Sequence, residues 1–393
     1  MTTKPVNRRQ PPTHCERRIA NSVAARIARS LLIWLTVCLP LAAHIVMAQP
    51  TNPPAWQRWL EAAPPVPEFK PATTLKAWRK QRAEVRDRLW QLLGKLPRRP
   101  KQPAVQTLSR DDRGDFFLEK FQFDNGAGDI VPGYLLLPRS PAKKSPAILY
   151  CHWHGGQYDV GKEELFRTNA VPVPAGPTLA RRGFVVIAVD ASGFGERNGR
   201  GPGGPGEKSG AGEMTASKFN LWLGRTLWGM MLRDDLVALD YLCARPEVDA
   251  RRVGVTGISM GATRTWWLMA LDERLKAGVA VCCLTRYQDL IAAGNLRAHG
   301  IYYFAPGLLN HFDTEAVVAL AAPRPLLFQS GELDAGSPVQ GIRVIESKVS
   351  KLYALHGAAE NFQSRIYPGV GHVYTPEMWE RTLAWLERHL GGK

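Results

Sequence analysis

Short, continuously apolar segments alternate with longer amphipathic segments along most of the chain. Such apolar runs predict strands buried on both faces, because a strand with one wet face alternates apolar and polar residues. The predicted strands are Phe116–Phe123, Ile130–Leu137, Ala147–Cys151, Phe184–Asp190, Val253–Thr256, Ala277–Cys283, Pro325–Gln329 and Ser364–Tyr367. The predicted helices between and after them are Thr178–Arg182, Leu227–Ala244, Ala262–Leu271, Gln340–Leu355 and Pro376–Leu390. We therefore expect an α/β fold with a mostly parallel central sheet and helices on both faces.

Two segments interrupt this alternation. Gly193–Gly212 is rich in glycine, and Arg286–Leu320 is an insertion between predicted strands 6 and 7 with little clear periodicity. Long irregular segments in a compact domain usually serve as lids or binding loops. Residues 111–390, which contain both segments, are predicted to form one domain.

An N-terminal extension at residues 49–110 precedes this domain. It begins as a proline-rich tether with one short helix near Trp56–Leu60. A longer helix is predicted over Thr74–Leu96 and ends at Pro97, because proline lacks the backbone N–H that a helix interior requires.

Residues 1–48 have the pattern of an export signal. A basic region precedes the apolar core Leu31–Ala43, and Val46–Ala48 offers small residues where a signal peptidase reads. We expect a signal peptide that is cleaved near Ala48-Gln49, and a periplasmic or extracellular protein. The alternative is an uncleaved membrane anchor, although the apolar run is shorter than the ~20 residues of a spanning helix.

The composition indicates a folded and basic protein. The chain has 393 residues, 45% of them apolar, and a formal net charge of +16, part of which lies in the leader. This apolar content argues against disorder. The charge would suit an acidic polysaccharide or an anionic surface, and the alternative is simply a soluble basic protein. Without a zinc finger, a basic repeat or an RNP-like string, we expect no nucleic-acid partner.

Four cysteines lie beyond the leader. Most of them fall on apolar, strand-like segments, where cysteine usually behaves as a small buried hydrophobe. A disulfide framework is not indicated in a domain of this size, but a single bridge among them stays open. The four are Cys151, Cys243, Cys282 and Cys283.

The segment Gly257–Gly261 reads G-I-S-M-G and carries the candidate nucleophile, Ser259. It follows a predicted strand and precedes a predicted helix, which is the context of a nucleophile elbow. The glycines allow close backbone approach around a sharp turn. The helix that begins there directs free N–H groups toward developing negative charge. The alternative is an ordinary strand-to-helix turn. The presence of a base and of an orienting carboxylate elsewhere in the chain distinguishes the two interpretations.

A serine needs a base, and the base needs a carboxylate that orients it. His372 follows the last predicted strand in a glycine-flanked loop, and we expect it to be the base. Asp334 follows the strand before that one and is the expected orienting carboxylate, with Glu332 as the alternative. The carboxyl ends of strands are where open α/β sheets place their sites. The chain order of serine, acid and base is that of the same fold class.

Two backbone N–H groups are predicted to bind the oxyanion. One belongs to Met260, directly after the serine. The other belongs to His154, or else Gly155, in the string His152–Gly156, which reads H-W-H-G-G after a predicted strand. An alternative for the two histidines of this string is metal binding, but no acidic residue lies close in sequence.

Residues 75–390 resemble the α/β-hydrolases of the dienelactone-hydrolase and acetyl-xylan-esterase-like group. The strings that carry the resemblance are His152–Gly156, Asp190–Arg197, Arg245–Gly254, Gly257–Gly261 and Gly371-His372. The resemblance implies a catalytic domain over residues 111–390 that hydrolyses carboxyl esters through an acyl-enzyme, without a metal or organic cofactor. Dienelactone hydrolases proper carry a cysteine nucleophile where this chain has Ser259.

The substrate is expected to be an ester, with acetyl esters on carbohydrate as the first candidate. Trp153, Arg297, His299 and His311 are the predicted contacts to it, three of them on the insertion. One alternative is a serine peptidase of the prolyl-oligopeptidase type, although some 100 residues before the first predicted strand are few for that family's propeller. The other is a non-catalytic, envelope-bound interaction protein on the same fold. A membrane partner is expected only if the leader is retained.

Overall fold

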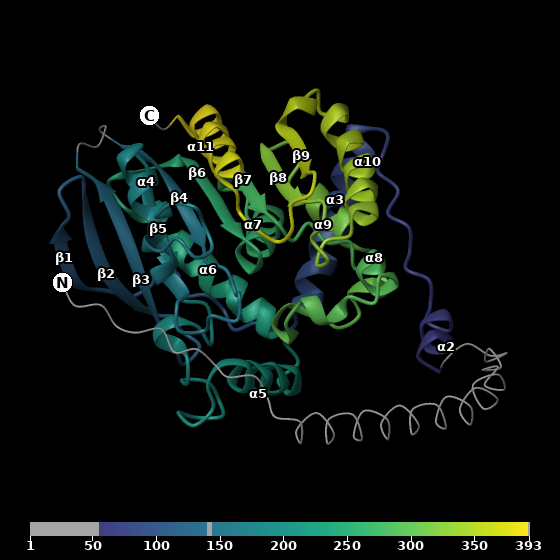
Figure 1. Cartoon of the computed structure of the whole chain (residues 1–393), viewed down its shortest axis with the longest axis horizontal. Coiled ribbons are helices and arrows are strands. Elements are labelled where there is room, and N and C mark those ends of the chain that lie inside the picture. Colours follow the sequence, from purple (N-terminus) through teal and green to yellow (C-terminus); the bar gives the residue numbers. More distant parts are fainter. Residues whose placement is uncertain (1–54, 140–143, 392–393) are drawn as a thin grey trace, which may run out of the picture. The chain divides into compact units, whose positions relative to one another are not determined.

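The computed structural model of the protein describes residues 55–139 and 144–391 (Figure 1). The predicted leader and its cleavage site lie outside these residues. The chain divides into a first unit that ends at Pro64 and a second unit over 65–393. In the first unit, helix α2 (Ala55–Glu61) forms where the short helix is predicted. Among the described residues, none of the helices combines the length and the apolar character that crossing a bilayer demands.

The second unit is built on a nine-stranded sheet in the order β1-β2-β3-β5-β4-β6-β7-β8-β9. Its strands are β1 (Val105–Asp112), β2 (Phe116–Asp124), β3 (Ile130–Pro138), β4 (Ser145–Cys151), β5 (Val185–Val189), β6 (Val248–Ile258), β7 (Leu275–Val281), β8 (Leu326–Gly331) and β9 (Phe362–Tyr367). Strands β1, β2, β3 and β5 pair antiparallel in that order. From β5 through β4 to β9 every pairing is parallel. The expected mostly parallel sheet is confirmed.

Helices cover both faces of this sheet (Figure 1). They are α3 (Leu75–Leu93), α4 (Ala175–Arg181), α5 (Ser209–Trp222), α6 (Leu227–Ala244), α7 (Met260–Leu271), α8 (Tyr287–Ala292), α9 (Thr314–Ala319), α10 (Val339–Leu355) and α11 (Pro376–Leu390). Helices α4 and α11 pack on one face with Ile148 and Val279, whereas α3, α6, α7, α9 and α10 pack on the other with Leu149 and Val255. Consecutive residues of β4 thus enter opposite cores, as the period of a strand requires.

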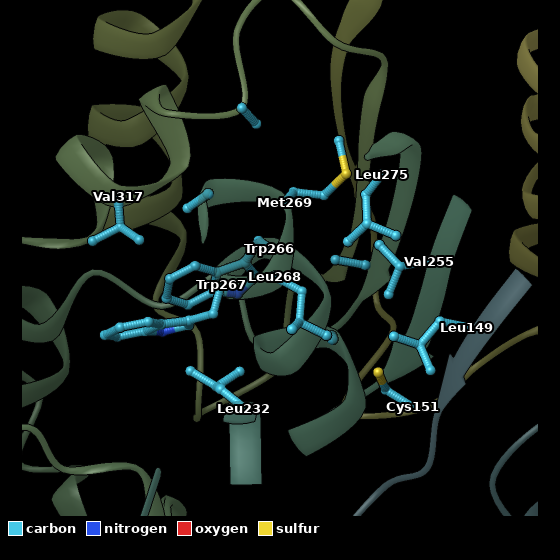
Figure 2. Packing of buried hydrophobic residues seen from close by; sticks show 14 of the residues in the cluster. Leu149, Cys151, Leu232, Val255, Trp266, Trp267, Leu268, Met269, Leu275 and Val317 are labelled. Carbon is cyan, nitrogen blue, oxygen red and sulfur yellow. The ribbon is translucent and has the colours of Figure 1, made fainter. Parts of the chain in front are cut away.

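Helix α7 lies in the larger of the two cores. Its Trp266 and Trp267 are almost completely buried and belong to one apolar cluster with Leu232 of α6 and Val317 of α9 (Figure 2). Burying aromatic side chains of this size is among the largest single contributions to a core. The helix that begins at the candidate nucleophile is therefore fixed along its length.

Arg264 of α7 is buried as well and forms an ion pair with Asp235 of α6. The guanidinium Nε donates to Asp235 Oδ2 over 2.8 Å, and a second nitrogen donates to Oδ1. Burial lowers the pKa of Arg264, but the charge and hydrogen bonds of Asp235, together with nearby Cys151 and Glu164, raise the pKa overall. The pair ties the nucleophile helix to its neighbour in a region where an unpaired charge is costly.

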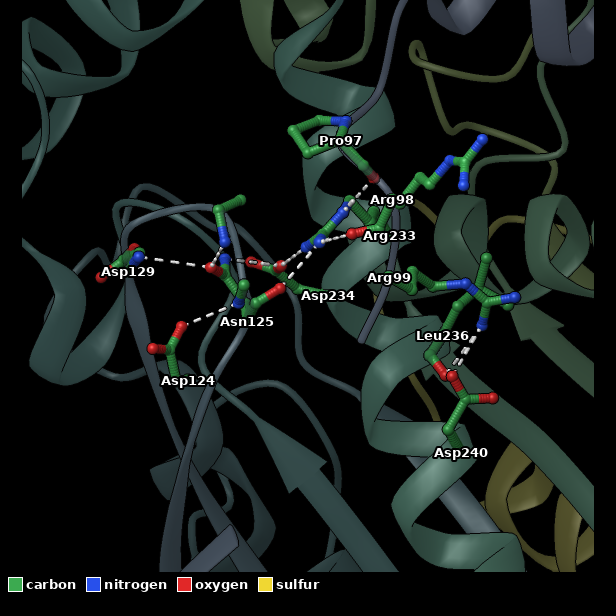
Figure 3. Close-up of polar contacts among 12 residues, drawn as sticks. Pro97, Arg98, Arg99, Asp124, Asn125, Asp129, Arg233, Asp234, Leu236 and Asp240 are labelled. Carbon is green, nitrogen blue, oxygen red and sulfur yellow. Dashed lines mark hydrogen bonds and ion pairs between the residues drawn. The ribbon is translucent and has the colours of Figure 1, made fainter. Parts of the chain in front are cut away.

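A second polar network joins the N-terminal extension to the domain (Figure 3). Arg233 of α6 donates to Pro97 O and Arg98 O, and also to Asn125 O in the β2–β3 hairpin. Asn125 in turn donates to Asp234 of α6 over 2.9 Å. These bonds satisfy carbonyl groups at residues 97–98, a segment without regular structure, so this segment follows a defined path along α6.

Four of the described strands and α-helices, β1, α5, α8 and α9, are absent from the predictions. Strand β1 has an edge position and mostly exposed polar residues, so no apolar run marks it. Helix α5 begins inside the glycine-rich segment Gly193–Gly212, where Gly210 and Gly212 obscure its first turn. The insertion, which lies between β7 and β8, contains α8, α9 and three short 3₁₀ turns. The four cysteines beyond the leader are free thiols.

The buried ion pair yields a prediction for stability. Asp235→Ala leaves the Arg264 guanidinium buried without its partner, which we expect to lower the free energy of unfolding by about 3–5 kcal/mol. Asp115→Ala is the matched control, because Asp115 pairs with Arg181 at an exposed site and should cost at most about 1 kcal/mol. Urea denaturation of the two variants checks this, and equal losses would contradict it.

Candidate active site

Three predicted residues lie around one cavity where parallel strands end, and among them a hydrogen bond joins His372 to Asp334. Ser259 follows β6, Asp334 follows β8 and His372 follows β9. All three line one cavity of about 620 Å³. The carboxyl ends of parallel strands lie at the same edge of a sheet, so residues far apart in sequence come together there.

The backbone at Ser259 is strained. Its φ of 58° and ψ of −119° lie outside the regions that a non-glycine residue prefers. On either side the turn is too crowded for a side chain, because a Cβ on Gly257 or Gly261 would lie 2.2 or 2.0 Å from Cys151 O. Both glycines of the G-x-S-x-G segment are therefore required by the close approach of β4. The turn presents the serine hydroxyl at the start of α7, as a nucleophile elbow does.

His372 and Asp334 form a hydrogen-bonded pair. His372 Nδ1 lies 2.8 Å from Asp334 Oδ2, and Asp334 Oδ1 accepts from Gly336 N–H over 2.9 Å. The Asp334 side chain is buried, whereas His372 reaches the cavity with 36% of its side chain exposed. An ionised carboxylate at Nδ1 selects the tautomer with hydrogen on that atom and leaves Nε2 able to accept a proton.

Glu332, the alternative carboxylate, has a different partner. It accepts from Gly369 N–H over 2.9 Å and so supports the loop that carries His372. Gly331 allows this loop to lie against β8, since a Cβ there would be 2.2 Å from Gly371 O. The geometry assigns Asp334, and not Glu332, as the neighbour of the imidazole.

The loop after β4 has a defined pattern of backbone hydrogen bonds. Trp153 N–H donates to Glu164 Oε2 over 2.7 Å. Gly156 N–H donates to the Nδ1 of His154 over 3.0 Å, and Gln157 N–H donates to His154 O over 2.8 Å. These three N–H groups are thus occupied and cannot also bind an oxyanion.

Of the loop residues that line the cavity, His154 and Gly155 have N–H groups for which the described part of the chain offers no acceptor. Both residues line the cavity with Ser259. Met260 N–H is in the first turn of α7, where a helix has no internal acceptor for it. The predicted oxyanion donors therefore have free N–H groups beside the serine.

The two histidines of this loop have partners at both ring nitrogens. His152 is fully buried, with Nδ1 at 2.8 Å from Trp153 O and Nε2 accepting from Ala191 N–H. Burial lowers the pKa of His152 well below its usual value, so the ring is neutral. His154 bonds Gly156 through Nδ1 and Glu213 through Nε2. The arrangement is that of loop anchors and leaves no ring nitrogen for a metal.

Among the described residues, one other group has ligand atoms close enough to share a metal ion. Atoms of Cys282, Asp334 and His372 lie within 4.8 Å of one another. Two of these residues already bond each other, and burial raises the pKa of Cys282 well above its usual value. A neutral thiol beside an occupied His–Asp pair suits a structural neighbour of the site better than a metal ligand.

Cys283 also borders the site, which the sequence did not indicate. Its Sγ lies 4.0 Å from Ser259 Oγ, and burial raises its pKa to about 12. A thiol with this pKa is protonated at neutral pH and is a poor nucleophile. The sequence signal that could have placed Cys283 at the site is its position at the end of the predicted strand Ala277–Cys283, which pairs with the strand before Ser259.

The predicted substrate contacts divide into two groups. Arg297 and His299 line the cavity, and His299 is held by Gly336 O at 2.9 Å. Trp153 and His311 are absent from that lining. The Trp153 indole packs on the core that contains α11, and His311 is exposed at the end of a short 3₁₀ turn.

The nine-stranded, mostly parallel sheet and the elbow at its edge define an α/β-hydrolase. The chain belongs to the Abhydrolase family, whose model matches residues 55–378. It is 36% identical over 312 residues to a Bacillus subtilis protein named "Putative hydrolase YtaP", covering 79% of this chain and 100% of that protein. These findings confirm the resemblance to the superfamily and establish the protein as a hydrolase.

Two further proteins are informative. Dipeptidyl-peptidase 5 of Porphyromonas gingivalis is 32% identical over an alignment of 327 residues, and the match covers 74% of this chain but 41% of that protein. The crystal structure of a putative acetyl xylan esterase from Bacteroides fragilis has a TM-score of 0.63 at 22% identity. The match covers 86% of this chain and 89% of that one, and it shows a shared fold.

Glu164, which anchors the loop after β4, makes stability depend on pH. Burial raises its pKa from 4.5 to about 7, so between these pH values the folded protein keeps a proton that the unfolded chain has released. The free energy of unfolding then falls as pH rises through this window, by up to about 3 kcal/mol.

The Glu164→Gln variant should lack this decrease, because an amide does not titrate and its oxygen can still accept from Trp153 N–H. Urea denaturation of both proteins between pH 4.5 and 8 measures the difference. Parallel stability curves for the two proteins would show that Glu164 does not cause the effect.

Proposed function

We propose that this hydrolase is an exported serine carboxylesterase that cleaves ester bonds through an acyl-enzyme intermediate. The observation that carries the proposal is the His372–Asp334 pair, 2.8 Å apart, which shares one cavity with the strained elbow serine. Export is supported by the pattern of residues 1–48. Neither a metal nor an organic cofactor is needed for this chemistry.

In the proposed reaction, Ser259 Oγ attacks the ester carbonyl carbon while His372 Nε2 takes the hydroxyl proton. The negative charge that forms on the carbonyl oxygen is stabilised by Met260 N–H and by the N–H of His154 or Gly155. The bond to the alcohol oxygen breaks as His372 returns the proton to it. Water then attacks the acyl-enzyme, with His372 as base, and releases the acid and free Ser259.

The cavity supports a polar substrate. It is lined by Arg297, His299 and His154 as well as by the catalytic candidates, and glycine backbone at 155 and 156 borders it. Arg297 is exposed there and has no ion-pair partner among the described residues. Acetyl esters on carbohydrate fit such a site, and the fold shared with the Bacteroides fragilis protein named "putative acetyl xylan esterase" agrees with this choice.

The second candidate function is peptide hydrolysis. It is favoured by the 32% identity to a dipeptidyl-peptidase over most of this chain. The same serine, acid and base would attack an amide instead of an ester. The two functions differ in the leaving group, which is an alcohol in one case and an amine in the other.

Removal of the nucleophile tests the mechanism. We expect Ser259→Ala to lower turnover of a small acetyl ester by ~10⁵–10⁶ and to abolish labelling by a fluorophosphonate probe. Ser347→Ala, at an exposed position on α10, is the control and should retain both. Near-normal turnover by Ser259→Ala would reject the assignment of this serine.

A substrate panel separates the two functions. Acetylated xylan, an aryl acetate and a dipeptide amide are assayed with the same preparation of the wild-type protein and of Ser259→Ala. We expect Ser259-dependent release of acetate from the first two and no cleavage of the amide. Faster cleavage of the amide than of either ester would favour the peptidase.

A further inference from the structure

The loop that carries the second oxyanion donor is held by two buried carboxylates from outside the sheet. Glu164 lies on a 3₁₀ turn, Gly161–Phe166, between β4 and β5. Glu213 lies on α5, between β5 and β6. Their side chains contact the same short loop, one at Trp153 and the other at His154.

Glu164 binds the loop through its backbone. Its Oε2 accepts from Trp153 N–H, and its Oε1 accepts from Tyr150 OH over 2.6 Å. This carboxylate fixes the residue before His154 and removes one N–H from the cavity.

Glu213 binds the loop through a side chain. Its Oε2 lies 2.9 Å from His154 Nε2 and accepts from Tyr158 OH over 3.2 Å. Only 7% of the Glu213 side chain and 18% of the His154 side chain are exposed. His154 Nδ1 accepts from Gly156 N–H, so the ring nitrogen that faces Glu213 carries the hydrogen and donates it.

Aromatic side chains complete the enclosure of the His154 ring. Tyr302 of the insertion stacks on it at 5.1 Å with an interplanar angle of 22°, and Tyr158 meets its edge at 4.8 Å. With both nitrogens bonded and the ring face covered, the imidazole cannot turn without losing several contacts. The backbone of residue 154 is consequently held by its own side chain.

We propose that Glu213 is a positioning residue, which acts through His154 to hold the free N–H groups of this loop toward the oxyanion. The inference rests on the proposed function, because it assumes that Ser259 forms a tetrahedral intermediate. An oxyanion donor is effective when its direction is fixed before the reaction, and loss of one donor typically costs ~10²–10³ in kcat. Displacement of a donor by about 1 Å can cost up to ~10².

The test compares three substitutions at one position. Glu213→Ala removes the acceptor for His154, and we expect kcat on an aryl acetate to fall ~10–100-fold while KM changes less than ~3-fold. Glu213→Gln should remain within a few-fold of wild type, because its amide oxygen can accept the same hydrogen bonds. Glu213→Asp keeps a carboxylate, but its shorter side chain places that group farther from His154. We therefore expect kcat to fall as it does in Glu213→Ala. Lys218→Ala, at an exposed position of the same helix, is the matched control.

The affinity for a transition-state analogue distinguishes a misplaced oxyanion donor from a general loss of structure. Affinity for a boronic acid that adds to Ser259 should fall in Glu213→Ala by a factor similar to the loss in kcat, with thermal unfolding recorded alongside. If Glu213→Ala does not fold, Glu213→Asp replaces it under the same expectations. The inference is overturned if kcat and boronate affinity are retained, if only KM changes, or if Glu213→Gln loses as much kcat as Glu213→Ala.

Fluorophosphonate labelling distinguishes failure of the proposed function from failure of the inference about Glu213. If the probe does not label Ser259 in the wild-type protein, the proposed function itself is wrong. If it labels the wild-type protein and Glu213→Ala at the same rate, only the role of Glu213 is wrong. A slower rate in Glu213→Ala with a normal rate in Lys218→Ala supports it.

Discussion

The site depends on one close contact, between the last carbonyl of β4 and the turn that carries Ser259. In the parallel pairing of β4 with β6, Cys151 lies opposite Gly257, and its oxygen leaves no space for a side chain on either flanking glycine. The turn cannot relax toward β4, so Ser259 keeps a positive φ at a cost of order 1–3 kcal/mol. On the other side of the turn, the buried tryptophans and Arg264 of α7 prevent the helix from shifting. The surrounding packing thus maintains the strained turn.

The same contact determines where the rest of the site can form. Because β4 ends against the elbow, the loop that begins at His152 starts beside Ser259, and its free N–H groups border the same cavity. Asp334 and His372 follow the ends of β8 and β9, which lie on the other side of β6 from β4. A parallel sheet therefore brings together groups from both directions without requiring them to be close in sequence.

The sequence predicted those parts of the structure that local patterns encode. Continuous apolar runs mark the central strands because these are buried on both faces, and the glycines around Ser259 mark a turn with no room for Cβ. Strand β1 has neither signal, since an exposed edge strand can be polar throughout. The direction of a side chain is also not encoded locally. Trp153 lies in a predicted site loop, yet its partly buried indole packs against the core that contains α11.

Long-range polar contacts explain why the supports of the site could not be predicted. Glu213 meets His154 across 59 positions, and Glu164 meets Trp153 across 11, so neither pairing leaves a spacing pattern. Burying a carboxylate is unfavourable unless hydrogen bonds compensate for lost hydration, and here one donor to each carboxylate belongs to the loop beside the nucleophile. The dependence works in both directions: the carboxylates require the loop in this conformation, and the loop is held there by them. Segments inserted between strands therefore contribute more than a cover for the site, because they determine the conformation of a loop whose free N–H groups the sheet alone would leave undirected.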